Sequence, residues 1–370
     1  MKVAIITRHS INNYGSLLQA IAIQSAIELL GYECEIIDYV RSDESIIERE
    51  KTELAKKESW NNTFAKRMLY LLMRQPESIL SGVRFEKMQK QFLHLTRRYS
   101  HKDELITNKP IADCYMTGSD QVWGPVGRGE YDDCYCLSFT EESDKRLSYA
   151  SSFGHTEFTP ELELYYKKWL SRYKQLLVRE DSAQKQLCEW GFNAQQVIDP
   201  TLLLPKEYWS KFISKRQIKE KYILIYQLHN NKRLGYYAAA LAKKEGLKLF
   251  RVSQSMHQIT RAGKLVWCPG ISEFLSLIDN AECMITDSFH GTAFAINLNT
   301  PFIEVLPNNN TGTRNMSILR LTGLTNRILG EEDDYGIIKT KINFDAVNKI
   351  VENERNRSIT LLDKMLKSVD

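Results

Sequence analysis

The sequence lacks the features that mark a membrane span, a metal knuckle or a dinucleotide site. No run of about eighteen apolar residues occurs, so no helix is expected to cross a bilayer. The seven cysteines include no Cys-x-x-Cys pair, which predicts neither a zinc knuckle nor a thioredoxin-like site, and we expect no bound metal. Neither a Gly-x-Gly-x-x-Gly fingerprint nor a Walker loop is present, which disfavours dinucleotide and P-loop enzymes.

A strong excess of one charge is also missing. The chain has 50 basic and 46 acidic residues, and this balance argues against a dedicated nucleic-acid binder. The apolar run at Met1–Thr7 is too short for a signal peptide, so we expect a cytoplasmic protein. A length of 370 residues suits two domains of ordinary size.

The first part of the chain predicts a βαβ unit, and hence an α/β fold with a parallel sheet. Residues 2–7 predict a buried strand, the apolar spacing from Leu17 to Leu30 predicts a helix, and residues 33–39 predict the next strand. Further strands are expected at 113–117, 146–151 and 176–179, with a helix at 161–174.

Residues 41–110 interrupt this rhythm with a charge-rich helical pattern. Between positions 41 and 100 there are thirteen basic and eight acidic residues. We interpret the stretch as a helical insertion that packs on the sheet, and keep a helix on a membrane surface as the alternative.

A second α/β series follows the proline-containing connection at 197–205. The predicted strands are 222–226, 249–252, 281–286 and 302–305, and the predicted helices are 234–245, 272–280, 289–298 and 343–369. The expected domains are 1–205, with the insertion at about 41–110, and 206–345. A terminal helix at 346–370 is expected to pack back on the first domain.

Ligands of parallel sheets bind beyond the carboxyl ends of the strands, so loops that leave strands are the candidate sites. The strongest candidate is Asp287-Ser288-Phe289-His290-Gly291-Thr292, which follows a strand and opens a helix. Ser288 is a natural N-cap, and the first-turn amides form an anion site with His290 as a phosphate ligand or acid–base group. An ordinary capped helix with a half-buried histidine is the alternative.

Three further loops carry unusual polar residues. Arg179 leaves a strand and is suited to clamp a carboxylate or phosphate, although a surface salt bridge explains it equally well. In Gly118-Ser119-Asp120-Gln121, Asp120 is placed to orient or deprotonate a hydroxyl. Asn12-Asn13-Tyr14-Gly15 follows the first strand.

Five motifs in one order resemble the polysaccharide pyruvyl transferase family. They are Asn13-Tyr14-Gly15 with Leu18-Gln19, Gly118-Ser119-Asp120-Gln121-Val122-Trp123, Val178-Arg179-Glu180-Asp181-Ser182, Asp199-Pro200-Thr201-Leu202-Leu203 and Thr286-Asp287-Ser288-Phe289-His290-Gly291. The resemblance covers most of the chain, from position 12 to position 291.

The resemblance implies two Rossmann-like domains facing across a cleft, similar to type-B glycosyltransferases. It implies transfer of pyruvate from phosphoenolpyruvate to hydroxyls of a sugar in a polysaccharide or its precursor, forming a ketal and releasing phosphate. Phosphoenolpyruvate would be a substrate, and no cofactor is implied. The partners would be this donor and a glycan acceptor, with a lipid-linked acceptor and contact at the inner face of the membrane as open options.

Such a reaction needs a proton for the donor methylene and a base for the sugar hydroxyl, and we assign His290 as acid or phosphate ligand and Asp120 to the acceptor side. Some members carry a basic residue two places before the histidine, where this chain has Ser288; Arg314 is a candidate to supply the missing charge. The implied donor-binding residues are Arg179, Ser288, Phe289, Gly291 and Arg314, and the other cleft loops contribute Asn13, Tyr14, Gly15, Ser119 and Gln121.

Two other functions fit the same architecture. A nucleotide-sugar glycosyltransferase is disfavoured because no carboxylate lies between Asp287 and Glu304, where such enzymes often need one. A non-catalytic carbohydrate-binding protein stays open, since fold alone does not determine function.

Overall fold

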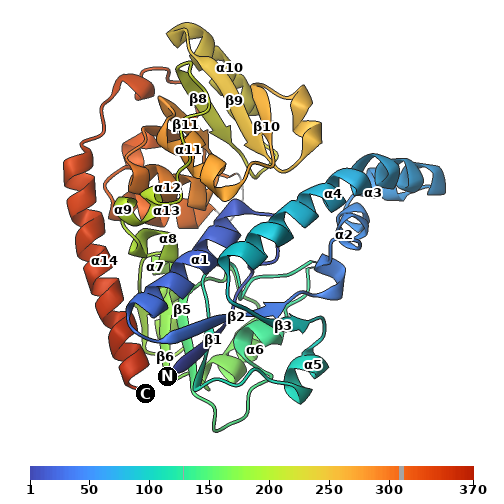
Figure 1. Ribbon diagram of the computed structural model, residues 1–370, viewed down its shortest axis with the longest axis vertical. Helices are drawn as coiled ribbons and strands as arrows, with labels where there is room; N and C mark the ends of the chain where they lie inside the picture. The colour runs from blue at the N-terminus through green and yellow to red at the C-terminus, as the bar shows by residue number, and fades with distance from the viewer. Residues whose placement is uncertain (128, 308–311) are drawn as a thin grey trace. The chain divides into compact units, whose positions relative to one another are not determined.

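The computed structural model describes residues 1–127, 129–307 and 312–370 (Figure 1). The chain divides into two compact units, each with its own parallel sheet. Unit 1 comprises Met1–Pro200 together with Ser358–Asp370, and unit 2 comprises Thr201–Arg357. The two sheets with their flanking helices confirm the α/β class.

Unit 1 is built on a seven-stranded sheet in which all neighbouring strands run parallel. The order β3-β2-β1-β4-β5-β6-β7 means that the chain starts in the middle, builds one half and then crosses to the other. The order reverses between β1 and β4, and ligands of open parallel sheets bind at such a reversal point. The strands are β1 (Lys2–Ile6), β2 (Glu33–Tyr39), β3 (Leu95–Tyr99), β4 (Cys114–Thr117), β5 (Arg146–Ser151), β6 (Gln175–Val178) and β7 (Ala194–Gln196).

Helix α1 (Tyr14–Leu29) is buried from Tyr14 to Ile27. Its burial is explained by α4 (Phe64–Phe92), which runs alongside it in Figure 1 and packs Phe85 against Tyr14 with ring centroids 5.0 Å apart. The other helices of unit 1 are α2 (Arg49–Ala55), α3 (Glu58–Asn61), α5 (Lys102–Thr107), α6 (Pro160–Leu170) and α7 (Asp181–Glu189), with short 3₁₀ turns η1 (Ser42–Glu44) and η2 (Asp133–Cys136).

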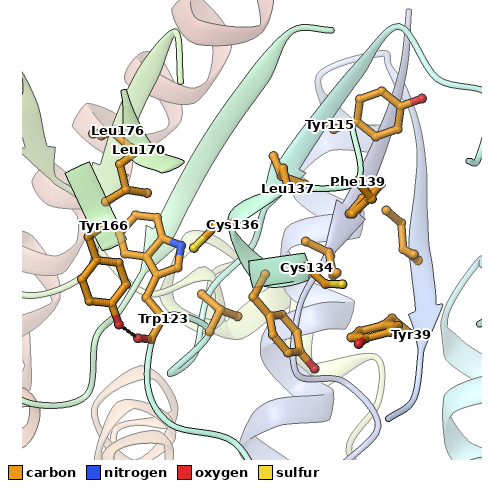
Figure 2. Packing of buried hydrophobic residues seen from close by; sticks show 14 of the residues in the cluster. Tyr39, Tyr115, Trp123, Cys134, Cys136, Leu137, Phe139, Tyr166, Leu170 and Leu176 are labelled. Carbon is orange, nitrogen blue, oxygen red and sulfur yellow. Dashed lines mark hydrogen bonds between the residues drawn. The ribbon is translucent and has the colours of Figure 1, made fainter. Parts of the chain in front are cut away.

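An aromatic core supports the loop that follows β4. Figure 2 shows Trp123 and Tyr166 in this core, and the Tyr166 hydroxyl donates a hydrogen bond to the Trp123 carbonyl. Phe153 lies 5.2 Å from the Trp123 ring and 4.7 Å from the Tyr166 ring, measured between centroids. Buried aromatic side chains therefore anchor the end of the 118–123 loop, which contains Asp120.

The prediction of an all-helical insertion over 41–110 is wrong at its end. Residues 95–99 form β3, which pairs with β2 and is the edge strand of the sheet. Helices occupy 42–92 and, after β3, Lys102–Thr107, and only one face of α4 packs on the unit. An edge strand pairs on one side only, and the Thr96-Arg97-Arg98 stretch gives it no apolar signal that a sequence pattern can detect.

Unit 2 carries a five-stranded parallel sheet in the order β10-β9-β8-β11-β12. The order again reverses at its centre, between β8 and β11. The strands are β8 (Tyr222–Tyr226), β9 (Lys248–Ser253), β10 (Lys264–Trp267), β11 (Cys283–Thr286) and β12 (Phe302–Glu304).

The helices of unit 2 follow its strands as expected for an α/β unit. The predicted helix at 289–298 is confirmed residue for residue as α12 (Phe289–Leu298). The others are α8 (Pro200–Leu203), which starts at the last residue of unit 1, α9 (Lys206–Ser210), α10 (Lys232–Glu245), α11 (Ile271–Asp279), α13 (Gly312–Leu321) and α14 (Phe344–Lys367), whose last residues belong to unit 1, with 3₁₀ turns η3 (Met256–Thr260), η4 (Thr325–Arg327) and η5 (Ile337–Lys339). Across the described ranges, no helix is both long and apolar enough to cross a membrane.

Candidate functional site

The predicted site residues of unit 1 lie at the reversal point of its sheet. Strand β1 pairs with β4, with Ile6 opposite Thr117, so the loops after both strands leave the sheet side by side. Asn13 is the N-cap of α1 and accepts a hydrogen bond from the Gly15 amide at 2.8 Å. Tyr14 is fully buried, and its contribution is packing against α4.

Asp120 is held in a conformation that few residues adopt. Its φ of 77° lies in the left-handed region, where a non-glycine residue is strained, and such strain is concentrated at functional sites. The carboxylate accepts hydrogen bonds from the Gln121 amide at 2.8 Å and from the Ser16 hydroxyl at 2.5 Å. Ser16, which sequence reasoning missed, thereby ties the loop after β4 to the first turn of α1.

Arg179 lies in a buried network of charges rather than in a surface salt bridge. Its guanidinium is paired with Glu180 at 3.0 Å and with Asp199 at 3.2 Å. The Ser119 hydroxyl donates to Asp199 at 3.0 Å. Burial alone would lower the pKa of Arg179, but the charges of Glu180, Asp199 and Asp120 raise it, so the side chain is firmly cationic.

This network is acidic overall. One arginine faces three carboxylates, from Asp120, Glu180 and Asp199. Much of the positive charge of Arg179 is therefore already compensated inside unit 1, which weakens its predicted role as a clamp for an anionic donor.

Unit 1 also contains a pocket of about 490 Å³, which is lined in part by the segments that follow β1, β2 and β3. Two of its lining residues have a buried polar atom without a hydrogen-bond partner, Nη1 of Arg49 and Oε2 of Glu44. The other atoms are engaged: Arg49 donates to the Ser10 carbonyl at 3.3 Å, and Glu44 accepts from Arg8 at 2.7 Å. An unsatisfied donor beside an unsatisfied acceptor matches the hydrogen-bonding needs of a sugar hydroxyl.

The predicted anion site of unit 2 is the N-terminus of α12. Ser288 caps the helix, and its hydroxyl accepts from the Gly291 amide at 3.2 Å. The first intrahelical bond joins the Thr292 amide to the Ser288 carbonyl at 2.9 Å, so the positive dipole end of the helix lies at this loop. Only glycine fits at 291, because an added Cβ would lie 2.6 Å from the Thr286 hydroxyl.

His290 is more buried than the sequence predicts. Its exposed fraction is 5%, against the half-buried side chain expected for a first-turn residue. Its ring stands edge-on to that of Phe289, with centroids 5.2 Å apart. The packed ring of Phe289 thus restrains the orientation of His290.

A second histidine, which the sequence analysis missed, lies near this loop. His229 follows β8, and its Nδ1 is 3.5 Å from Asp287. The amides of Leu228 and His229 donate to the Asp287 carboxylate at 2.7 and 3.0 Å. Asp287 therefore joins the loops after β8 and β11, and a histidine in a polar loop after a strand was the signal that could have revealed it.

A buried carboxyl group links α12 to α13. Glu304 is fully buried, accepts a hydrogen bond from the Asn315 amide group at 2.6 Å and is also bonded to the Thr292 hydroxyl. Burial raises the pKa of Glu304 to about 8 despite these hydrogen bonds, so the carboxyl is mostly protonated at neutral pH. The pair Glu304–Asn315 fixes the helix that carries Arg314, a buried residue.

Two solved structures share this fold over nearly their whole length. A UDP-GlcNAc 2-epimerase from Neisseria meningitidis bound to UDP-GlcNAc aligns with a TM-score of 0.50 at 12% identity, covering 100% of both chains. A protein described as a UDP-N-acetylglucosamine 2-epimerase from Listeria monocytogenes aligns with a TM-score of 0.54 at 11% identity, covering 100% of this chain and 97% of that chain. Identities this low establish the fold alone, and they confirm an architecture of the type-B glycosyltransferase kind.

The sequence itself identifies the family. No curated protein matches it significantly. The family model described as polysaccharide pyruvyl transferase matches residues 13–310, a range that begins at the N-cap of α1 and contains the loops after β4, β6 and β11. By this match, the chain belongs to the polysaccharide pyruvyl transferase family.

Proposed function

We propose that this protein transfers a pyruvyl group from phosphoenolpyruvate to two hydroxyls of a sugar in a polysaccharide or its precursor. The product is a cyclic ketal, and phosphate is released. The observation that carries the proposal is the N-terminus of α12, where a capped helix, a restrained histidine and the family motif coincide.

The donor side of the reaction needs an anion site and a proton donor. The positive end of α12 suits the phosphate of phosphoenolpyruvate. Ser288 is used as a helix cap, so the positive charge that other members place at this position must come from elsewhere. Arg314 on α13 is the donor-binding candidate in unit 2, and Glu304 positions its helix.

The protons of the reaction balance with one acid and one base. His290 delivers a proton to the methylene carbon of phosphoenolpyruvate, which makes C2 electrophilic. The first sugar hydroxyl bonds to C2 and loses its proton to Asp120. The bond from C2 to the phosphate oxygen then breaks, and the second sugar hydroxyl bonds to C2 and loses its proton. Of the two hydroxyl protons, one replaces the proton taken from His290 and the other leaves with the phosphate.

The pocket of unit 1 is the proposed acceptor site. Nη1 of Arg49 and Oε2 of Glu44 have no hydrogen-bond partner. A sugar hydroxyl can accept from the Arg49 guanidinium and donate to the Glu44 carboxylate. Asp120 follows β4, close to the loops that line this pocket after β1. A neutral or weakly charged sugar fits this pocket better than a strong anion, because its lining includes the side chains of Glu44, Glu48 and Glu86.

The surroundings of Glu304 argue against a nucleotide-sugar glycosyltransferase. Such enzymes often use a carboxylate in the stretch between Asp287 and Glu304 to hold the donor sugar or ribose, and this stretch has none. Glu304 is the carboxyl group at the end of β12, and it is fully buried and bonded to Thr292 and Asn315. It therefore offers no acceptor oxygen to a ligand.

The proposal is tested by thermal shift and by phosphate release. Phosphoenolpyruvate should raise the unfolding midpoint by mass action, whereas nucleotide sugars should leave it unchanged. Phosphate should then be released from phosphoenolpyruvate only when a suitable glycan is added. Stabilisation by a nucleotide sugar but not by phosphoenolpyruvate would establish the glycosyltransferase alternative, and stabilisation by glycans alone would favour a binding protein.

A further inference from the structure

Unit 2 contains a cationic pocket that the proposed reaction does not use. The pocket has a volume of about 210 Å³ and lies between the loop after β8, the first turn of α10, strand β9 and residues 260–262. Three cationic side chains line it, from Lys232, Arg251 and Arg261, and no carboxylate is found among its described lining residues. An uncompensated cluster of cations is costly to assemble unless an anion completes it.

Arg251 is the central group of this pocket. Only 2% of the residue is exposed, and within the described ranges it forms no ion pair. It donates to the Ala262 carbonyl at 2.9 Å and to the Gln227 side chain at 2.7 Å. Burial, followed by repulsion from Arg261, lowers the pKa of Arg251 to about 10, and these two effects outweigh the attraction of Asp287, which acts in the opposite direction.

The first turn of α10 adds to the positive potential. This helix of 14 residues starts at Lys232 and is capped by Asn231, which accepts from the Arg233 amide at 3.0 Å. Its positive dipole end faces the same pocket. Gly235 keeps the wall open, since an added Cβ would lie 3.3 Å from Nη2 of Arg251.

We propose that this pocket binds a phosphate group, either as free phosphate or on a phosphorylated sugar. Three cations and a helix N-terminus favour a tetrahedral, multiply charged anion over a single carboxylate. Tyr236, which is 72% exposed, lines the same pocket and offers a ring face for a sugar. The proposal does not depend on pyruvyl transfer.

Isothermal titration with inorganic phosphate, glucose 1-phosphate and glucose tests this site. We expect binding of both phosphates and none of glucose, and tighter binding of glucose 1-phosphate would assign the site to a sugar phosphate. The double variant Lys232→Ala, Arg261→Ala should bind at least about tenfold more weakly. The control Lys243→Ala, Lys248→Ala removes the same charge from exposed positions of unit 2 and should bind as the wild type does.

The number of sites separates this pocket from α12. If the N-terminus of α12 also binds phosphate, the double variant of the pocket should keep the α12 site and lose the pocket site. Unchanged affinity and site number in the pocket variant would overturn the proposal, provided that circular dichroism shows both variants folded. Binding of glucose equal to that of glucose 1-phosphate would also overturn it.

A different observation concerns α4, which has two apolar faces. One face is buried in unit 1 and includes Tyr70, Phe85 and Met88. The residues of the other face recur at intervals of four and seven, the spacing of a single helical stripe. These exposed side chains are Phe64, Met68, Leu69, Leu72, Met73, Ile79, Leu80 and Val83. Such a long exposed apolar stripe marks an interaction surface.

The charges of α4 indicate what covers this stripe. The helix has six basic and two acidic residues, and Lys66, Arg67 and Lys87 are exposed. Both acidic residues are engaged, Glu77 with Arg74 at 3.2 Å and Glu86 with Lys90 at 3.2 Å. A second copy of the chain would bring like charges together at a symmetric interface, whereas an anionic lipid surface complements them.

We infer that α4 lies in the interface of an anionic membrane, with the exposed stripe between the headgroups. Co-sedimentation with vesicles of phosphatidylglycerol and phosphatidylcholine should show binding that weakens with salt, and vesicles of phosphatidylcholine alone should bind weakly. The variant Leu72→Asp, Leu80→Asp should lose at least about tenfold in binding. The control Ile111→Asp, Leu164→Asp makes the same change at exposed sites outside α4 and should bind normally.

The oligomeric state gives the opposing outcome. A wild-type dimer that Leu72→Asp, Leu80→Asp converts to a monomer, without vesicle binding by either protein, would assign the stripe to self-association. Equal vesicle binding by this variant and the wild type would also overturn the membrane assignment.

Discussion

The two sheets have similar topology, but the charged groups at their carboxyl ends differ in kind and in how they are compensated. In unit 1 the loops bring together Asp120, Glu180 and Asp199 around a single arginine, Arg179. In unit 2, Asp287 accepts hydrogen bonds from two backbone amides, and Glu304 is mostly protonated because burial raises its pKa.

The difference separates the two halves of the proposed chemistry. A surplus of carboxylates suits the removal of a hydroxyl proton, whereas helix N-termini and cations suit an anionic donor. Parallel-sheet topology places loops at one edge in both units, but the residues in those loops decide which ligand each edge accepts.

The largest expected effect is that of His290→Ala, which removes the proposed acid of unit 2. Turnover should fall by about two to four orders of magnitude, the usual contribution of general acid–base catalysis. Because the side chain is buried, we also expect a loss of about 1–3 kcal/mol of unfolding free energy. Steady-state phosphate release and a denaturant titration measure the two effects separately.

Two asparagine variants refine this test. His290→Asn keeps a hydrogen-bond donor but transfers no proton, so a wild-type rate would make His290 a phosphate ligand only. His229→Asn changes the other histidine near Asp287 and should retain most activity. An equal loss in both variants would contradict a unique role for His290.

The next effect concerns the buried charge network around Arg179 in unit 1. Arg179→Met leaves Glu180 and Asp199 buried without their counter-charge, and should lower the unfolding free energy by about 3–5 kcal/mol. Arg357→Met is the control, because its exposed pair with Glu354 contributes less than about 1 kcal/mol. If Arg179→Met is as stable as the wild type but binds phosphoenolpyruvate weakly, Arg179 is a donor clamp after all.

Some elements of the fold could be predicted from the sequence, and others could not. The strands at 33–39, 146–151 and 222–226 were predicted residue for residue, and the continuous apolar run of the last is typical of a buried central strand. Strands β7 and β10 were missed, since both are short edge strands with polar residues. The cap at Ser288 was predicted because N-capping is a local property of the chain.

The charged sites could not be predicted in the same way. Burial of Arg179 and Arg251, and the raised pKa of Glu304, result from side chains distant in sequence. The pocket beside Arg49 lies in a segment that reads only as charge-rich helix. Tertiary packing, which no local pattern encodes, determines whether a charged residue is compensated.

A smaller effect should follow from Glu304→Gln in unit 2. Folding raises the pKa of Glu304 from 4.5 to about 8, so the wild type loses stability as pH rises through this window. Glutamine keeps hydrogen bonds to Thr292 and Asn315 without ionising, and the variant should be more stable by about 2–4 kcal/mol at pH 8. Denaturant titrations across this pH window measure the difference, with the exposed Glu282→Gln as control. Parallel pH profiles of variant and wild type would contradict a protonated Glu304.

The smallest expected change in stability is at Ser288, and this residue tests whether the donor phosphate binds at the N-terminus of α12. Ser288→Ala removes the cap of α12 and should cost about 1 kcal/mol of unfolding free energy. Ser288→Asp keeps a capping oxygen and should preserve stability, yet it places a carboxylate where the donor phosphate is proposed to bind. Donor affinity, measured by titration with phosphoenolpyruvate, should therefore fall much further in Ser288→Asp than in Ser288→Ala. If the aspartate variant binds phosphoenolpyruvate as tightly as the wild type, the donor phosphate does not lie at this helix end, and the cationic pocket around Arg251 becomes the place to look for it.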